Sequence, residues 1–252
     1  MPRRGILTPT ERESLFAFPA EPEDLVRHYT LSEADFSVIN QRRGDHNRLG
    51  FAVQLCCLRY PGYALAPDAS PPEPFVSMVS RQLNLSPGLW SLYGQRAETR
   101  REHLLELQAW LGLTPFGIRH YRSSILLLTE IGLQTDRGIR LATALVESLR
   151  QKRIIVPAID VIERVCAHAL TRGTRRVHDA LTGSLTDRHS IALDGLIIPK
   201  DEELLSPLAW LQQPPGAPNA KNILLHIDRL RTINSLGLPD GLEHAIHQNR
   251  LF

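Results

Sequence analysis

Apolar residues recur at helical spacing along nearly the whole chain, and this periodicity constrains the fold more than any other feature. Between residues 138 and 153 one face holds Ile139, Ala142, Leu145, Val146 and Leu149, three or four residues apart. Such intervals are typical of an amphipathic helix with one side in a core. A run with strand character is confined to residues 153–156, which are too few to form a sheet. The chain is therefore predicted to be all-α.

Capping signals and turn residues divide the chain into separate helices. Thr8-Pro9-Thr10-Glu11 is a capping box with proline at the first helical position, and Thr30-Leu31-Ser32-Glu33 begins another helix. The pattern predicts helices over residues 9–18, 23–29, 33–41, 49–58, 74–83, 96–111, 115–131, 138–153, 157–172, 174–185 and 220–236. A basic helix end followed by proline near residues 154–157 predicts two domains, 1–153 and 154–252.

Composition excludes several classes of protein. Cys56 and Cys57 are adjacent and Cys166 stands alone, so neither a disulfide framework nor a zinc motif is indicated, and we expect all three to be buried. No apolar stretch has the length of a membrane helix, and acidic residues follow the basic start at once, unlike a signal peptide. A cytoplasmic protein without a membrane contact is expected.

Positive charge is concentrated in the middle of the chain. Between Arg96 and Arg176 there are 14 lysines and arginines against 8 acidic residues, whereas the net charge of the whole chain is +2. Arginine supplies nearly all of it, and its planar fork suits phosphate and guanine. A high-GC genome also raises the arginine content, so the excess alone does not establish nucleic-acid binding.

Residues 98–130 have the pattern of a helix-turn-helix. A charged helix ends at Leu111, and Gly112-Leu113-Thr114-Pro115 is predicted to be a tight turn with Thr114 as the N-cap of the next helix. That helix places Tyr121, Ile125 and Leu128 inward, which leaves Arg119, Arg122 and Ser123 on its outer face. In a recognition helix this part lies in the major groove. The alternative is a helical hairpin with a solvated arginine face.

A second candidate is the polar turn at residues 42–48. Arg42, Arg43, His46 and Arg48 carry hydrogen-bonding side chains around Gly44, as phosphate contact requires. The alternative is a structural turn in which Asp45 pairs with an arginine and Asn47 caps the following helix.

A third basic run, Arg172-Gly173-Thr174-Arg175-Arg176, is predicted to link two helices. Arg175 and Arg176 could extend a phosphate-binding track, and a solvated turn is the alternative.

Nothing in the sequence indicates an enzyme. Glycine-rich phosphate loops and the G-x-S-x-G motif are absent, and no residue is assigned to catalysis, to a metal or to a cofactor. The dense acidic cluster Asp201-Glu202-Glu203 follows Pro199, where acids favour a helix start.

One block of sequence resembles the N-terminal region of the Tn-three family of replicative transposases. The segments that carry the resemblance are His28-Tyr29-Thr30-Leu31-Ser32-Glu33-Ala34-Asp35, Gln41-Arg42-Arg43-Gly44-Asp45-His46-Asn47-Arg48-Leu49-Gly50-Phe51-Ala52 and Gln54-Leu55-Cys56-Cys57-Leu58-Arg59-Tyr60-Pro61-Gly62. Residues 208–215, 228–230 and Asn249-Arg250-Leu251 also fit.

The resemblance implies that the chain recognises terminal inverted repeats of a transposon through helical DNA-binding modules. It also implies that strand cleavage belongs to a metal-dependent domain farther along a longer protein. The alternatives are an interaction protein that pairs with full-length transposase or with itself, and an independent nuclease.

Overall fold

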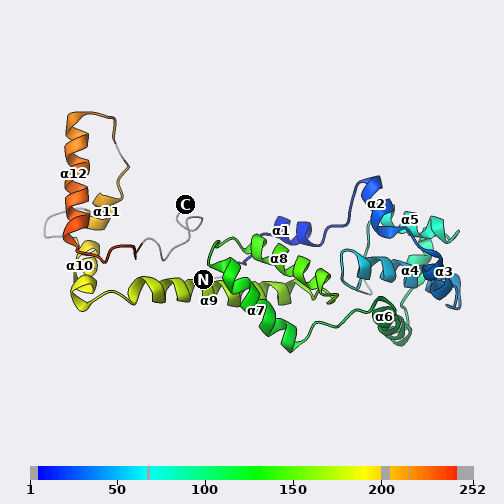
Figure 1. Ribbon diagram of the computed structural model, residues 1–252. Coiled ribbons are helices and arrows are strands. Elements are labelled where there is room, and N and C mark those ends of the chain that lie inside the picture. The colour runs from blue at the N-terminus through cyan, green and yellow to red at the C-terminus, as the bar shows by residue number, and fades with distance from the viewer. Residues whose placement is uncertain (1–4, 67–68, 200–204, 215, 243–252) are drawn as a thin grey trace. The chain divides into compact units, whose positions relative to one another are not determined.

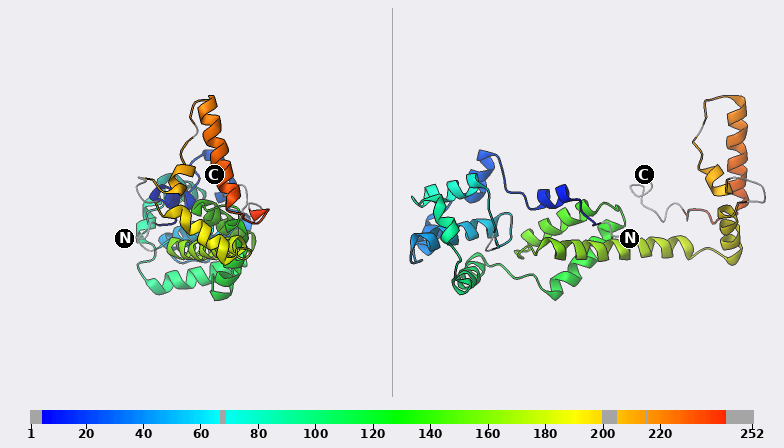
Figure 2. Two further views of the ribbon diagram at one scale, coloured as in Figure 1. Left: turned by 90° about the vertical axis from the view of Figure 1, so that its left-hand side faces the viewer. Right: turned by 180° about the vertical axis from the view of Figure 1, so that it is seen from behind.

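The computed structural model describes residues 5–66, 69–199, 205–214 and 216–242, and these ranges are built from helices (Figures 1 and 2). The described residues form no β-strand. Thr114 and Ile154 are joined by an isolated β-bridge. The predicted all-α class is confirmed. No helix within these ranges has the length and apolar character to cross a membrane. Asp201-Glu202-Glu203 and Asn249-Arg250-Leu251 lie outside the described residues.

The chain folds as two compact units, one of residues 1–132 and 136–170, the other of residues 133–135 and 171–252. The first unit contains α1 (Pro9–Leu15), α2 (Pro22–Tyr29), α3 (Glu33–Ile39), α4 (Asp45–Arg59), α5 (Glu73–Gln82), the 3-10 helix η1 (Pro87–Leu92), α6 (Ala97–Leu111), α7 (Ile118–Gly132) and α8 (Gly138–Gln151). The second contains α10 (Asp187–Ile197), α11 (Pro207–Leu211) and α12 (Ala220–Ser235). Helix α9 (Ile159–Thr182) begins in the first and ends in the second.

Helix α4 is the centre of one hydrophobic core in the first unit. Every residue from Leu49 to Leu58 is buried, because α2, α3, α5, η1 and α6 all pack against this helix. Gly50 permits the closest approach, since a Cβ atom there would lie 2.0 Å from the ring of Tyr93 at the end of η1. A helix that is apolar on all sides is stable only in such a position.

A second core of the same unit lies among α1, α7, α8 and the first half of α9. The predicted face of α8 is buried here, with Ala142 and Leu145 fully enclosed beside Ile162 and Cys166 of α9. Arg12 of α1 donates to both carboxylate oxygens of Glu163 at 2.8 and 3.0 Å. The capping box at Thr8 is present as predicted and fixes the start of α1.

Backbone hydrogen bonds join the segment before α7 to the segment before α9. The amide of Thr114 donates to the carbonyl of Arg153 at 2.9 Å, and the amide of Ile155 donates to the carbonyl of Thr114 at 3.0 Å. The amide of Val156 donates to the carbonyl of Gly62 at 2.9 Å, which links this junction to the end of the α4 core.

The second unit has little apolar interior. Two large side chains, those of Val177 and Arg229, are buried among its described residues. Helix α10 has no buried residue, and α11 packs against it. The helices of this unit therefore leave much of their aliphatic surface exposed.

The predicted break at Arg172–Arg176 is wrong, because α9 runs through it without interruption. The apolar stripe of Cys166 and Ala169 continues through Gly173 to Val177, at intervals of three and four residues. A single glycine inside a helical pattern costs only about 1 kcal/mol relative to alanine, which a buried stripe offsets. Arg175 and Arg176 therefore lie on a helix and not in a turn.

Three short elements were not predicted: η1, α10 and α11. Helix α10 begins with a capping box in which Thr186 pairs with His189 at the third position, where the usual signature has Glu or Gln. The start of α10 therefore does not match the usual capping-box motif in the sequence.

Candidate nucleic-acid interface

The first two turns of α7 present the arginine face that the sequence predicts. Arg119, Arg122 and Ser123 are all exposed, while Tyr121 and Ile125 pack against the second core beside the buried Leu128. The inward and outward faces of this helix are therefore confirmed. Among the residues that the structure describes, neither Arg119 nor Arg122 has a hydrogen-bond or ion-pair partner. Both guanidinium groups are available to a ligand.

This face offers hydrogen-bond donors from the two arginines and one hydrogen-bond acceptor, the hydroxyl oxygen of Ser123. Ser123 uses its hydroxyl hydrogen, which it donates to the carbonyl of His120 at 3.0 Å, so its oxygen remains free to accept. Residues three and four apart on a helix are surface neighbours, which places the two arginines and this serine side by side. The first turn of a helix also carries amides without intrahelical partners.

The start of α7 differs from the prediction. Thr114 is not its N-cap, because both backbone groups of Thr114 are bonded to Arg153 and Ile155, which hold the segment extended. Helix α6 ends at Gly112 in the left-handed conformation, with φ 61°, and α7 begins only at Ile118. Gly117 takes the capping position: its carbonyl accepts from the amide of Tyr121 at 2.9 Å.

Helices α6 and α7 find their main partners elsewhere in the first unit. Helix α6 packs against α4, whereas α7 packs against α8. The predicted tight turn between α6 and α7 is thus replaced by an extended connection across residues 113–117. The exposed arginine face belongs to a pair formed by α7 and α8.

The second cluster surrounds the start of α4, where Gly44 is the N-cap at φ 84°. Arg42 is held within the protein: it donates to both oxygens of Glu106 at 2.6 and 2.7 Å, and its guanidinium lies 4.9 Å from the centroid of the Phe51 ring. The structure thereby gives Arg42 a structural role. Its side chain is 16% exposed, which leaves little of it for a ligand.

The other members of the cluster are more accessible. The side chain of Arg43 is exposed and has no hydrogen-bond or ion-pair partner in the described ranges, and His46 is half-buried. Arg48 donates to the carbonyl of Arg42 at 3.2 Å and pairs with Asp45 at 3.4 Å. The predicted pairing of Asp45 with an arginine is confirmed.

The predicted cap at Asn47 is wrong. Asn47 lies inside α4, and its amide Nδ2 donates back to the carbonyl of Arg43 at 2.9 Å. The positive φ of Gly44 lets the helix begin three residues earlier than an Asn47 cap would require.

The third candidate pair lies on α9. Arg175 and Arg176 are both exposed, and Arg175 lies 3.9 Å from Asp179 one turn later. An exposed pair at this distance contributes little, so Arg175 can exchange Asp179 for another anion.

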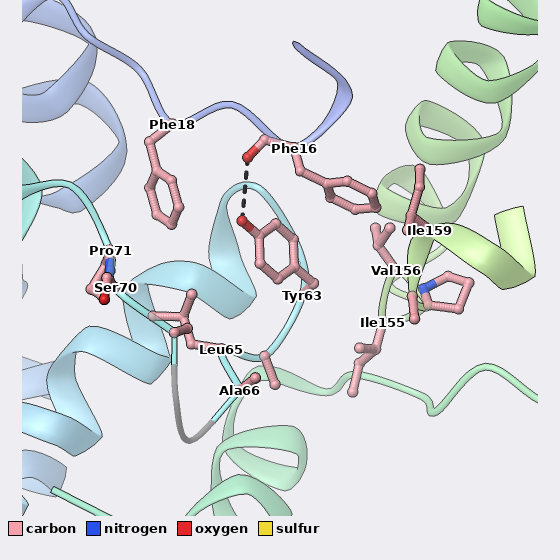
Figure 3. A pocket seen from close by; sticks show the side chains of 14 residues that line it. Phe16, Phe18, Tyr63, Leu65, Ala66, Ser70, Pro71, Ile155, Val156 and Ile159 are labelled. Carbon is pink, nitrogen blue, oxygen red and sulfur yellow. Dashed lines mark hydrogen bonds between the residues drawn. The ribbon is translucent and has the colours of Figure 1, made fainter. Parts of the chain in front are cut away.

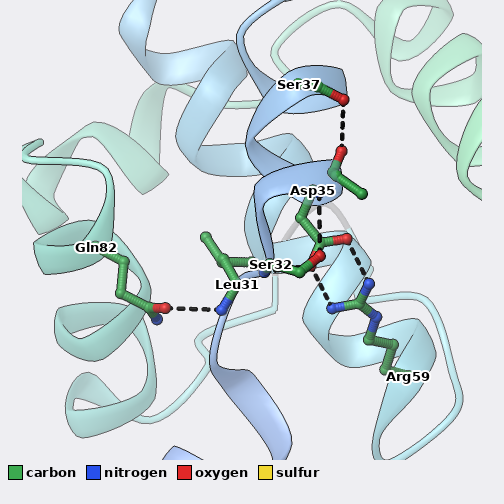
Figure 4. A network of polar contacts seen from close by, with 7 residues as sticks. Leu31, Ser32, Asp35, Ser37, Arg59 and Gln82 are labelled. Atoms are coloured by element: carbon green, nitrogen blue, oxygen red, sulfur yellow. Dashed lines mark hydrogen bonds and ion pairs between the residues drawn. The ribbon is translucent and has the colours of Figure 1, made fainter.

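A structural arginine outside the predicted sites is Arg59, at the end of α4. It donates from both Nη atoms to the two oxygens of the buried Asp35, which also accepts from the amide and the hydroxyl of Ser32 at 2.8 Å (Figure 4). Burial alone would raise the pKa of the Asp35 carboxyl, but the hydrogen bonds from Arg59 and Ser32 outweigh it and lower the pKa. This network fixes α3 on α4 and leaves no free charge.

An apolar cavity of about 550 Å³ lies in the first unit beside Phe16, Phe18, Tyr63 and residues 155–159 (Figure 3). The hydroxyl of Tyr63 is already engaged, donating to the carbonyl of Phe16 at 3.2 Å. A cavity of this character does not suit a phosphate. Within the described ranges no group of three or more His, Cys, Asp or Glu side chains is placed to hold a metal ion.

Comparison with known proteins gives the chain a family and relatives. Residues 6–169 match the family described as a domain of unknown function, DUF4158, a range that ends one residue before the end of the first unit. The whole chain is 54% identical to part of the transposase for transposon Tn3926 of Escherichia coli and 51% identical to part of the transposase for transposon Tn501 of Pseudomonas aeruginosa. Over 92% of its length it is 31% identical to the transposase for transposon gamma-delta of Escherichia coli K12. In each case the match covers 25% of the relative, so the chain spans about a quarter of the length of these proteins.

Proposed function

Because the chain belongs to the DUF4158 family and is related along its whole length to Tn-three family transposases, we propose that it binds double-stranded DNA at the terminal inverted repeats of a transposon. In this proposal the first two turns of α7 lie in the major groove. Arg119 and Arg122 read base edges there, and Ser123 accepts a hydrogen bond from a base amino group.

The observation that carries the proposal is the pair of unpartnered arginines on a rigid helix. Arginines at the surface of a folded protein commonly meet a nearby carboxylate, as Arg164 meets Asp160 at 3.0 Å on α9. Arg119 and Arg122 instead project from a helix whose opposite side packs on a buried core. Two free guanidinium groups on one helix face suit bidentate contact with guanine.

Phosphate contact is proposed for Arg43, His46 and Arg48 at the start of α4, and for Arg175 and Arg176 on α9. These side chains are accessible, and the amides of the first turn of α4 lie beside the first three. Arg42 is left out of the contact set because Glu106 occupies it.

Strand cleavage is assigned to parts of the transposase other than these residues. The chain corresponds to a quarter of its relatives, and none of its described residues forms an acidic metal site. The proposed role is recognition of the DNA end.

The experiment is a salt-titrated binding assay that compares a duplex of the cognate inverted repeat with a scrambled duplex. Phosphate contacts weaken with counterion release as salt rises, whereas base contacts persist, so preference for the repeat should survive at high salt. Arg164→Ala is the matched control, because Arg164 is an exposed arginine already paired on α9. Equal affinity for both duplexes, lost together as salt rises, would refute end recognition.

A second candidate function is interference with a full-length transposase through protein contact. The observation that favours it is the exposed aliphatic surface of the second unit. Co-purification with full-length transposase at high salt and without DNA would support it over competition for the repeats.

A further inference from the structure

Arg153, just after α8, adopts a backbone conformation that arginine rarely takes. Its φ is 54°, in the left-handed region, and the amide of Ile154 donates to the carbonyl of Leu149 at 2.8 Å. This is a Schellman motif, in which the left-handed residue is usually glycine and sometimes asparagine. Helices α5 and α6 end in the same motif with those residues, Asn84 at φ 54° and Gly112 at φ 61°. A left-handed conformation costs stability for a residue with a Cβ atom, and residues held in one commonly have a function.

Arg153 lines a cavity of about 310 Å³ where α4, α6 and α8 end. Arg59 and Arg150 line the same cavity, and none of the described residues around it is acidic. Arg59 is neutralised by its two-pronged pair with the buried Asp35. Arg150 and Arg153 have no ion-pair partner among the residues that the structure describes. Two guanidinium groups with uncompensated charge therefore lie at this cavity.

Arginines at helix ends can serve only to donate to the last carbonyls, but here the backbone meets most of that need. A carbonyl near the end of each helix accepts a backbone amide at 2.8 Å: those of Cys57, Gln108 and Leu149. Arg150 uses its Nε on the carbonyl of Pro61 at 2.7 Å. Arg153 donates from Nη1 to the carbonyl of Leu111 at 3.4 Å, which is long for a hydrogen bond. Because a guanidinium group has five N–H donors, most donors of both side chains remain available.

We propose that this cavity, here called the Arg153 cavity, binds one phosphate group through Arg150 and Arg153. A phosphate matches the guanidinium fork in both charge and geometry. Arg150 is held in place for this contact, since its guanidinium carbon lies 4.8 Å from the centroid of the Tyr60 ring. A backbone phosphate of DNA and a free phosphate ion present the same chemistry. The DNA source rests on the proposed function and adds a contact that is independent of base sequence.

The test uses Arg153→Gly, which removes the side chain and leaves a residue suited to the left-handed conformation. The variant should unfold at a temperature no lower than that of the wild type, because glycine takes a positive φ without steric cost. If a DNA phosphate fills the cavity, the variant should bind the repeat and the scrambled duplex about five- to tenfold more weakly at about 0.1 M salt. The slope of log affinity against log salt should fall by about 1. Arg153→Lys should keep the wild-type slope, because it keeps the charge.

A second arm compares sodium phosphate with sodium chloride at equal ionic strength. If a free ion fills the cavity, phosphate should raise the unfolding temperature of the wild type more than that of Arg153→Gly, and the two proteins should bind DNA with the same salt slope. A variant that matches the wild type in both its salt slope and its response to phosphate would overturn the phosphate site. Loss of preference for the repeat refutes end recognition alone, because the slope is measured on both duplexes.

The matched control is Asn84→Gly, which introduces glycine at the corresponding position after α5, at a residue that does not line the cavity. It should keep the affinity, the salt slope and the phosphate response of the wild type. Equal weakening of DNA binding by both glycine variants would overturn the assignment to Arg153. Arg153→Asn covers the case in which Arg153→Gly fails to fold. Asparagine also suits the left-handed region and lacks the charge, so this variant should lose the same binding.

Discussion

Arg42 and Glu106, 64 residues apart in the sequence, form a two-pronged ion pair with N···O distances of 2.6 and 2.7 Å. The pair fastens the start of α4 to α6 and lies against the ring of Phe51. Neighbouring arginines in the same motif therefore differ in role: Arg42 supports the fold, while Arg43 faces solvent.

Arg42→Ala should lower the free energy of unfolding by about 1–3 kcal/mol, because it removes a charge-assisted pair and its packing on an aromatic ring. Arg43→Ala should change it by less than about 0.5 kcal/mol, as is usual for an exposed side chain. Urea denaturation followed by circular dichroism measures both. Equal stability of the two variants would contradict the assignment of Arg42 to the fold.

Arg122→Ala should weaken binding to the inverted repeat by about 1–3 kcal/mol and relax the preference at one base pair. Fluorescence anisotropy with a panel of single-base variants of the repeat measures both effects. Arg43→Ala should instead weaken binding to every duplex alike and reduce the salt slope by about 1. Uniform weakening by Arg122→Ala would reassign Arg122 to phosphate contact.

Asp35→Asn should make stability less dependent on acid pH. The pKa of Asp35 is lower in the folded protein than in the unfolded chain, so its stabilising effect is complete above the unfolded value of about 3.9 and is lost as pH falls through the folded value. The variant should be less stable by about 2 kcal/mol at pH 7, and the difference should shrink below about pH 4.

Urea unfolding at several pH values, with Asp160→Asn as the exposed control, checks this expectation. Asp160 is 68% exposed and pairs with Arg164 at the surface, so its replacement should have little effect at any pH. A difference between Asp35→Asn and wild type that stays constant down to pH 2 would exclude the ion pair as its cause.

Gly50→Ala should destabilise the first unit by about 2–4 kcal/mol, because the added methyl group would overlap the ring of Tyr93. Gly195→Ala in α10 is the contrasting change: no atom lies within 4 Å of the added group, and alanine should raise helix stability by about 0.5–1 kcal/mol. Thermal unfolding monitored by circular dichroism distinguishes the two. A tolerated Gly50→Ala would mean that η1 does not press on α4.

The three cysteines should resist alkylation in the folded protein. All three are buried, and burial raises the pKa of Cys56 and Cys166 to about 12 and that of Cys57 well above its usual value. Since the thiolate is the reactive form, a chromogenic thiol reagent at pH 8 should react only after urea is added. Rapid reaction of the folded chain would show that one of the two cores opens readily: the α4 core if Cys56 or Cys57 reacts, the second core if Cys166 reacts.

Local patterns predicted the helical class, the capping box at Thr8, the start of a helix at residues 30–33 and the buried face of α8. Each depends on residues within one or two helical turns. The exposed arginine face of α7 was found in the same way, from the spacing of Tyr121, Ile125 and Leu128.

What the sequence did not reveal depends on distant partners. The local sequence predicts that Thr114 caps a helix. In the structure its amide and carbonyl groups are hydrogen-bonded to Arg153 and Ile155, about forty residues later. The sequence predicts that Arg42 contacts phosphate, whereas in the structure it is paired with Glu106, 64 residues later. Gly173 predicts a helix break. The structure shows instead that Gly173 belongs to a buried stripe on α9, which stabilises the helix through this position.

The junction at Thr114 also bears on how the DNA preference of such a protein can change. Because Thr114 is bonded to both Arg153 and Ile155, the chain enters and leaves the α7–α8 pair at one point. The inner sides of the two helices are fixed by the second core, in which they pack against α1 and α9. The outer face of α7 carries no such constraint, since substitutions at exposed positions usually change stability by less than about 0.5 kcal/mol. On the proposed function, new DNA ends become recognisable through substitutions on one exposed helix face.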